Sequence, residues 1–203
     1  MADDPPSPRP SPFVERLPLG QRLPLGDLVG DELFPFDGEI SVKPLQPPIL
    51  PEPPRRGEPG GEPCPACRGG REEVAWEDER WSVVIGTKPH GLPMVAVLQP
   101  KAHHDLEGLP FELAAELGLL IQRVALALQR IGGVGRVHVN RWGDGGEHFH
   151  VWFLARPEGM RQLRGAMLAV WDDLLPAVPQ EEWDRNRQAV AAALAEDGGV
   201  SLA

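Results

Sequence analysis

Residues 147–155 read Glu-His-Phe-His-Val-Trp-Phe-Leu-Ala, and this stretch decides how the rest of the chain can be arranged. It is rich in aromatic and aliphatic residues, which is typical of a β-strand. Because successive side chains of a strand point to opposite faces, polar rings gather on one face and apolar groups on the other. The first set is His148, His150, Trp152 and Leu154, and the second is Phe149, Val151, Phe153 and Ala155. One face of the predicted sheet can therefore be buried, while the other presents imidazole and indole groups.

A partner strand is predicted just before this stretch. Residues 134–140 have a strand pattern, and the Gly-rich residues 142–146 join the two strands as a hairpin. The polar Arg136, His138 and Asn140 fall on one side of this strand, and Val137 and Val139 fall on the other. The hairpin therefore extends both the apolar face and the polar face.

The remaining elements are short strands followed by helices. Strand patterns occur at residues 74–76, 81–85 and 94–98. Residues 110–131 change to a helical period, with apolar side chains three and four residues apart. Residues 160–175 and 181–195 also have helical patterns. The chain is predicted to be an α+β protein with a largely antiparallel sheet, a long helix packed on one face, and C-terminal helices.

The N-terminal part of the chain has a different composition. Of the 24 prolines, 16 precede Cys64, and these residues favour extended or irregular backbone. Residues 1–60 are predicted to be a Pro-rich, mostly irregular arm, and residues 61–203 the folded domain with its C-terminal helical extension. An arm that packs along its own domain, or along a dimer mate, is the alternative.

Charge and hydropathy exclude several functions. The net charge is −10 and no basic run is present, which argues against a nucleic-acid partner and against a basic membrane anchor. No apolar stretch approaches the roughly 18–20 residues that span a bilayer, and the N-terminus lacks a signal-peptide pattern. A cytoplasmic location is expected. Three lysines against 17 arginines, with abundant Ala, Gly and Pro, suggest a high-GC bacterial genome.

Cys64-Pro-Ala-Cys67 is the strongest local motif. In a reducing compartment such a pair is more typical of a metal site than of a disulfide, and it supplies half of a tetrahedral zinc site. Redox-active or inert thiols are the alternative, although no parallel βαβ pattern surrounds the motif. The other two donors have to come from elsewhere, and the chain has only six histidines. No role is predicted for His90 or His104.

The order of the motifs resembles a known superfamily. Cys-x-x-Cys, an acidic hairpin, Pro100-Lys-Ala-His103, a long helix, Asn140 with a Gly-rich turn, and His148-x-His150 follow one another along the chain. This order is similar to that of the histidine triad (HIT-like) superfamily, including its uridylyltransferase relatives, over about residues 63–157. The resemblance implies a structural zinc held by Cys64, Cys67, His103 and His148.

The resemblance also implies a catalytic site. His150 corresponds to the nucleophile that attacks a nucleotide α-phosphate, a reaction for which a neutral imidazole is suited near pH 7. Asn140 and the turn residues Gly143, Gly145 and Gly146 are expected to face the phosphate oxygens. The implied partner is a small nucleotide or nucleotide-sugar, and the implied assembly is a homodimer.

Three positions depart from the family pattern. The third triad position, included among the catalytic residues, is Trp152, whose indole donates one hydrogen bond and accepts none. No hydroxyl residue precedes the triad, and the position of a ribose-binding acid is occupied by about Thr87. Two hypotheses therefore stand: a nucleotidyl hydrolase or transferase, and a catalytically weak or inactive zinc-stabilised binding module on the same fold.

Deleting residues 1–30 should leave the folded domain intact, because this Pro-rich segment is not expected to contribute to the core. The melting temperature of the truncated protein should stay within about 2 °C of the full chain in a thermal scan. An insoluble product, or the loss of a cooperative melt, would show instead that the arm belongs to the core.

Overall fold

The computed structural model describes residues 20, 21, 34, 36, 38, 40, 44 and 46–203. The chain divides into two units, Met1–Pro54 and Arg55–Ala203. In the described part of the first unit the backbone is irregular, and the rings of Phe34 and Phe36 lie 5.5 Å apart, edge to face. Most of the predicted arm lies outside the described residues.

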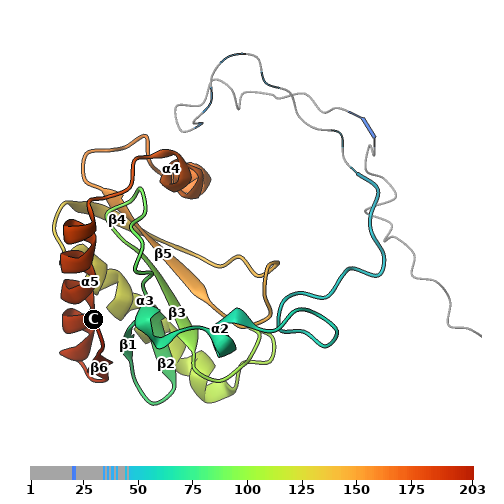
Figure 1. The fold of residues 1–203 in the computed structure, drawn as a ribbon, viewed down its shortest axis with the longest axis horizontal. Coiled ribbons are helices and arrows are strands. Elements are labelled where there is room, and N and C mark those ends of the chain that lie inside the picture. Colours follow the sequence, from blue (N-terminus) through green and yellow to red (C-terminus); the bar gives the residue numbers. More distant parts are fainter. Residues whose placement is uncertain are drawn as a thin grey trace, which may run out of the picture. The chain divides into compact units, whose positions relative to one another are not determined.

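The second unit is built on a six-stranded sheet with the order β4-β5-β3-β2-β1-β6 (Figure 1). The strands are β1 (Val74–Glu77), β2 (Trp81–Val84), β3 (Val95–Pro100), β4 (Val134–Asn140), β5 (Val151–Pro157) and β6 (Val200–Ser201). Every neighbouring pair is antiparallel. The predicted α+β class with a largely antiparallel sheet is therefore confirmed.

Two long helices cover one face of this sheet. Helix α3 (Phe111–Gln129) packs on β3, β4 and β5, and α5 (Gln180–Ala195) packs on β1, β6 and α3. The buried side of α3 carries residues from the predicted apolar stripe: Leu113, Leu120, Val124 and Leu128. The helix ends at Gln129, and the chain turns just beyond it at Gly132 and Gly133, whose φ values of 81° and 64° glycine tolerates without steric cost.

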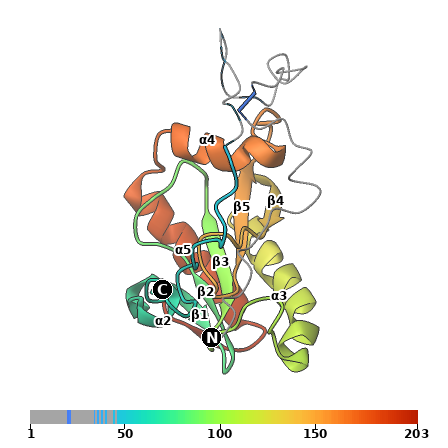
Figure 2. The same ribbon diagram turned by 90° about the vertical axis from the view of Figure 1, so that its right-hand side faces the viewer.

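On the opposite face of the sheet, the described residues form no long helix. Short helices stand at its two ends: α2 (Pro65–Arg68) at one end and α4 (Leu168–Leu174) at the other (Figures 1 and 2). This open face is where the polar side of the predicted hairpin points. Trp152 lies opposite Asn140, and Leu154 lies opposite His138.

The structure differs from the predicted elements at three places. Strand β5 begins at Val151 rather than at residue 147, because the preceding backbone is hydrogen-bonded elsewhere. Glu147 N donates to Arg56 O at 2.9 Å and Phe149 N donates to His104 O at 2.6 Å. The predicted helix 160–175 is reduced to α4 and the preceding 3₁₀ turn η3 (Gly165–Met167). The two-residue strand β6 was not predicted.

Among the described residues, no helix is long and apolar enough to cross a membrane.

Candidate functional site

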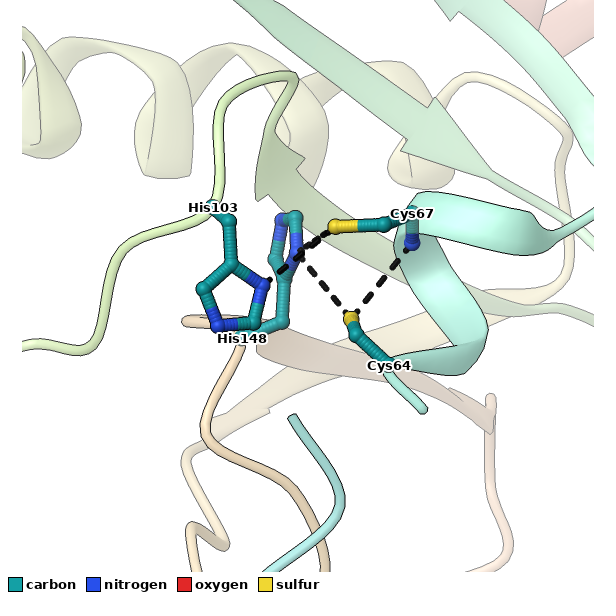
Figure 3. Close-up of side chains that lie close together, drawn as sticks. All are labelled: Cys64, Cys67, His103 and His148. Atoms are coloured by element: carbon teal, nitrogen blue, oxygen red, sulfur yellow. Dashed lines mark hydrogen bonds between the residues drawn. The ribbon is translucent and has the colours of Figure 1, made fainter. Parts of the chain in front are cut away.

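Four side chains that are distant in sequence form a Cys2His2 cluster (Figure 3). Their candidate ligand atoms all lie within 4.8 Å of one another. His148 Nδ1 is 3.5 Å from Cys64 Sγ and 3.5 Å from Cys67 Sγ, and His103 Nδ1 is 3.3 Å from Cys67 Sγ. The structure thus brings together the four residues for which the sequence resemblance implied a metal-binding role.

The local backbone explains how the two cysteines meet. Cys64 is the N-cap of α2, and its sulfur accepts a hydrogen bond from Cys67 N at 3.4 Å. Pro65 occupies the first helical position, where the missing N–H costs nothing. The single turn of helix therefore returns Cys67 to the side of Cys64. His103 comes from the loop after β3, and His148 from the loop before β5.

Both histidines are oriented by a second hydrogen bond on the other ring nitrogen. His103 Nε2 lies 2.9 Å from Glu147 Oε2, and His148 Nε2 lies 2.8 Å from the carbonyl oxygen of Pro100. Carboxylate and carbonyl oxygens only accept, so each Nε2 carries the proton and each Nδ1 presents a lone pair to the cluster. Such outer partners are usual for metal-binding histidines.

The proton affinities of the ligands differ. Burial opposes ionisation of Cys64, but hydrogen bonds, those from Cys67 first, outweigh it and lower the pKa of Cys64. Burial and the neighbouring Cys64 raise the pKa of Cys67 to about 11. Burial also lowers the pKa of His148, which keeps its imidazole neutral, as a metal ligand must be.

The geometry fits a zinc ion. Zn–S bonds of about 2.3 Å and Zn–N bonds of about 2.0–2.1 Å in a tetrahedron place sulfur and nitrogen about 3.5 Å apart. The observed S···N distances are 3.3–3.5 Å. Four protein ligands leave no open position, which makes the site structural rather than catalytic. The cluster confirms the predicted zinc site.

A pocket of about 840 Å³ lies on the open face of the sheet next to the cluster. Its floor is formed by β-strand residues: the apolar Val74, Val84, Val95, Val97, Trp152 and Leu154, and the polar Glu77, Ser82 and Gln99. The strand register explains this floor, since Val84 pairs with Val97 and Val97 with Trp152. Strands β1, β2 and β3 are too short for their sequence pattern to assign a face to these valines, so the floor was not predicted.

His150 lines the pocket in a fixed orientation. Its Nδ1 lies 2.7 Å from the carbonyl oxygen of His148, so Nδ1 donates and the neutral ring keeps its lone pair on Nε2. The ring is half-buried and meets the Trp152 ring edge to face, with centroids 6.2 Å apart. Trp142 lies 6.3 Å from Trp152, so two indoles flank this part of the pocket.

The other predicted site residues lie at different distances from the pocket. Gly145 and Gly146 line it, but Gly143 and Asn140 are not among its lining residues. Asn140 pairs with Trp152 across the β4–β5 register and so shares the open face. The carbonyl of Gly143 accepts a hydrogen bond from Arg55 at 2.9 Å, which gives this residue a structural contact.

Two arginines assigned to the N-terminal arm contact this site. Arg55 forms ion pairs with Glu58 and with Asp105, both at 2.6 Å. Arg56 donates from Nε to the carbonyl of Gly145 at 3.0 Å, forms a parallel bridge with Gly146, and lines the pocket. Within the described chain Arg56 has no ion pair.

Gly57 crosses close to the metal cluster. Its φ is +102°, and a Cβ at this position would lie 2.8 Å from His103 Cε1. A side chain here would strain the backbone and also displace the histidine ring. The contacts of Arg55, Arg56 and Gly57 were not predicted, because the Pro- and Gly-rich composition of this segment does not indicate which residues it touches.

No protein-family model matches the chain, and no curated protein does. Solved structures do, and they include histidine triad proteins and uridylyltransferases, the groups that the sequence resembles. A Zn-bound histidine triad family protein from Mycobacterium smegmatis is 22% identical, with 61% of this chain and 86% of that chain covered at a TM-score of 0.45. For a HIT-like protein involved in cell-cycle regulation from Bartonella henselae the identity is 19%, the coverage 60% and 85%, and the TM-score 0.44. A uridylyltransferase mutant is 21% identical, with 66% of this chain and 48% of that chain covered at a TM-score of 0.44.

Removing the metal should destabilise the domain, because the free energy of metal binding adds to the free energy of folding. Cys64→Ser, or treatment with a strong chelator, should lower the free energy of unfolding by about 3 kcal/mol or more. His104→Ala is the matched control, since this neighbouring histidine is outside the cluster and should leave melting and metal content unchanged. If the purified protein contains no metal, and its melting temperature is the same before and after EDTA, a structural zinc is ruled out.

Proposed function

We propose that the chain is a histidine-triad-like protein that binds a nucleotide or nucleotide-sugar in the open pocket and transfers or hydrolyses its nucleotidyl group through His150. The observation that carries the proposal is the orientation of His150. Its Nδ1 is fixed by the carbonyl of His148, its ring lines the pocket, and its Nε2 is left as the nucleophilic atom.

The chemistry follows from that orientation. In the first step Nε2 of His150 attacks the α-phosphorus, a P–N bond forms, and the bond to the leaving oxygen breaks with its electron pair. A proton from solvent neutralises the leaving group. In the second step water or an acceptor hydroxyl attacks the phosphorus, loses its proton, and releases the neutral imidazole. The product is a nucleoside monophosphate or its ester.

The nucleophile and the metal cluster share one residue. The ring of His148 is a zinc ligand, and its backbone carbonyl holds His150. A rigid cluster therefore fixes the acceptor that selects the tautomer of His150. Positioning of this kind lowers the reorganisation needed to reach the transition state.

Positive charge near the turn favours a phosphate at this end of the pocket. Arg56 lines the pocket beside Gly145 and Gly146, and its guanidinium has no carboxylate partner in the described chain. Arginine suits phosphate because its planar donors match two oxygens at once. The backbone N–H groups of the turn and the amide of Asn140, across from Trp152, would add donors.

The second candidate function is a binding module without turnover. Trp152 favours it, because an indole at the third triad position can donate one hydrogen bond but can neither accept one nor carry a proton to the leaving group. The zinc cluster and the pocket would be the same in both cases. The two free cysteines are compatible with a reducing, cytoplasmic location in either case.

We also propose a homodimer formed along the β4 edge. Strand β4 is the last strand of the sheet on its side, so its outer backbone groups can pair with a second copy. The apolar side chain of Val139 on β4 is exposed at this edge. Isologous pairing of such an edge closes the assembly at two copies.

The dimer is tested by one charge at the β4 edge. Val139→Glu should convert the protein to a monomer in sedimentation velocity, because it would bury an unpaired carboxylate. Leu174→Glu, a similarly exposed leucine on α4, is the control and should leave the mass unchanged. A monomeric wild-type protein at micromolar concentration would contradict the proposal.

The enzyme proposal is tested by replacing the nucleophile. His150→Ala should reduce turnover of nucleoside-monophosphate esters by at least about a thousandfold, because no other imidazole on this part of the pocket has a free nitrogen. The measurement is steady-state turnover together with mass spectrometry of the quenched protein for an acid-labile adduct on the peptide that contains His150.

The same variant separates chemistry from folding. Zinc content and melting temperature should stay as in the wild type, because the ring of His150 is outside the cluster. Nucleotides that raise the melting temperature without adduct or turnover would favour the binding module. A broad panel of nucleotides that neither bind nor react would end the nucleotide hypothesis altogether.

A further inference from the structure

The pocket extends past His150 to a second polar end below α4. Its lining there consists of His90, Asp172 and Asp173, with Ala169, Val95 and Leu154 between these residues and the centre. The two ends differ in charge. Arg56 and the Gly-rich turn lie at the His150 end, whereas two carboxylates and one imidazole lie at the α4 end.

His90 is held rigidly at this end. Its Nδ1 lies 2.9 Å from Asp172 Oδ2, and its ring stacks on the buried Trp183 with centroids 5.4 Å apart and planes at 26°. The other oxygen of Asp172 accepts a hydrogen bond from Leu92 N at 2.9 Å. Both oxygens of the carboxylate therefore help to orient the loop and the ring, and the hydrogen bond that His90 donates to Asp172 raises the pKa of His90.

The stacking on Trp183 and the hydrogen bond to Asp172 explain how the His90 ring is held, but they do not involve its Nε2 atom. Nε2 of His90 makes no hydrogen bond within the described residues, although the side chain is 41% exposed and lines the pocket. Asp173 is exposed next to it and forms no ion pair in the same part of the chain. Holding the loop in place requires only the hydrogen bond between Asp172 and Nδ1 of His90. Nε2 and the Asp173 carboxylate are therefore available to a ligand.

We infer that the α4 end binds hydrogen-bond donors, foremost sugar hydroxyls, of the ligand whose phosphate lies at His150. A carboxylate only accepts hydrogen bonds, and Nε2 accepts when the ring is neutral and donates when it is charged. A hydroxyl can both donate and accept, so it suits Nε2 in either state. This inference rests on the proposed function and specifies the class of its substrate.

The dimensions require a long ligand. Four residues of extended chain separate His150 from Leu154, which corresponds to about 13 Å, and the α4 end lies beyond Leu154. A volume of about 840 Å³ lies in the upper part of the range of 300–1,000 Å³ that is usual for small-molecule sites. The apolar floor between the ends suits a ring that stacks flat on Val97 and Leu154. The donor at the far end belongs either to a sugar beyond the phosphates or to an exocyclic amine of the base.

The test compares matched ligands by calorimetry on the zinc-loaded protein. UDP-glucose against UMP tests the sugar hydroxyls, and AMP against IMP tests the base amine. Asp173→Asn and His90→Asn are the variants. The asparagine at position 90 keeps an N–H donor toward Asp172 but lacks Nε2. Glu112→Gln, an exposed acid on α3 at the opposite face, is the control.

Each variant should lower the affinity for the ligand that reaches the α4 end about tenfold, as expected for the loss of one such hydrogen bond. The affinity for the shorter or amine-free ligand of the same pair should change less than twofold. A loss confined to UDP-glucose assigns the sugar hydroxyls, and a loss for AMP but not IMP assigns the base amine. Equal affinities of both variants and wild type for all four ligands would overturn the inference while leaving the proposed function in place. Failure of all four ligands to bind the wild-type protein would overturn both.

Discussion

The three hydrogen-bonding groups of His148 hold the site together. Nδ1 of its ring faces both cysteine sulfurs, and Nε2 lies against the carbonyl of Pro100 at the end of β3. Its backbone carbonyl accepts from Nδ1 of His150. One buried residue thus connects the metal ligands, the central strand and the candidate nucleophile, so the metal cluster and the pocket form one structural unit.

The sheet allows this arrangement because its two faces differ. One face is closed by α3 and α5 over buried aromatic and aliphatic residues, among them Phe153, Val83 and Trp76. The cation of Arg123 on α3 lies 5.3 Å from the Trp76 ring, which joins the helix layer to β1. The other face leaves a row of valines open between two short helices. A largely apolar floor with a small number of polar groups is typical of a small-molecule site.

Much of this could be predicted from the sequence, for identifiable reasons. The alternation in residues 151–155 and the helical stripe of α3 depend on short-range periodicity, which survives in the folded protein. His148 and His150 lie before the strand, yet they still point toward the side of Trp152. Arg56 and Gly57 could not be placed, because a Pro- and Gly-rich segment has no periodicity from which contacts can be read. The pair of His90 and Asp172 joins residues 82 positions apart. Only the tertiary fold brings these two together.

Cys64 and His148 are separated by 84 positions in the chain. The unfolded chain would have to close this long loop before all four ligands could meet one ion, so the folded chain binds the ion far more tightly. The ion therefore stabilises the folded state by binding to it, whereas a disulfide acts by a bond that persists in the unfolded chain. Unlike a disulfide, it is reversible and depends on the free concentration of metal. The folded fraction of this protein is thereby coupled to the zinc supply of its surroundings.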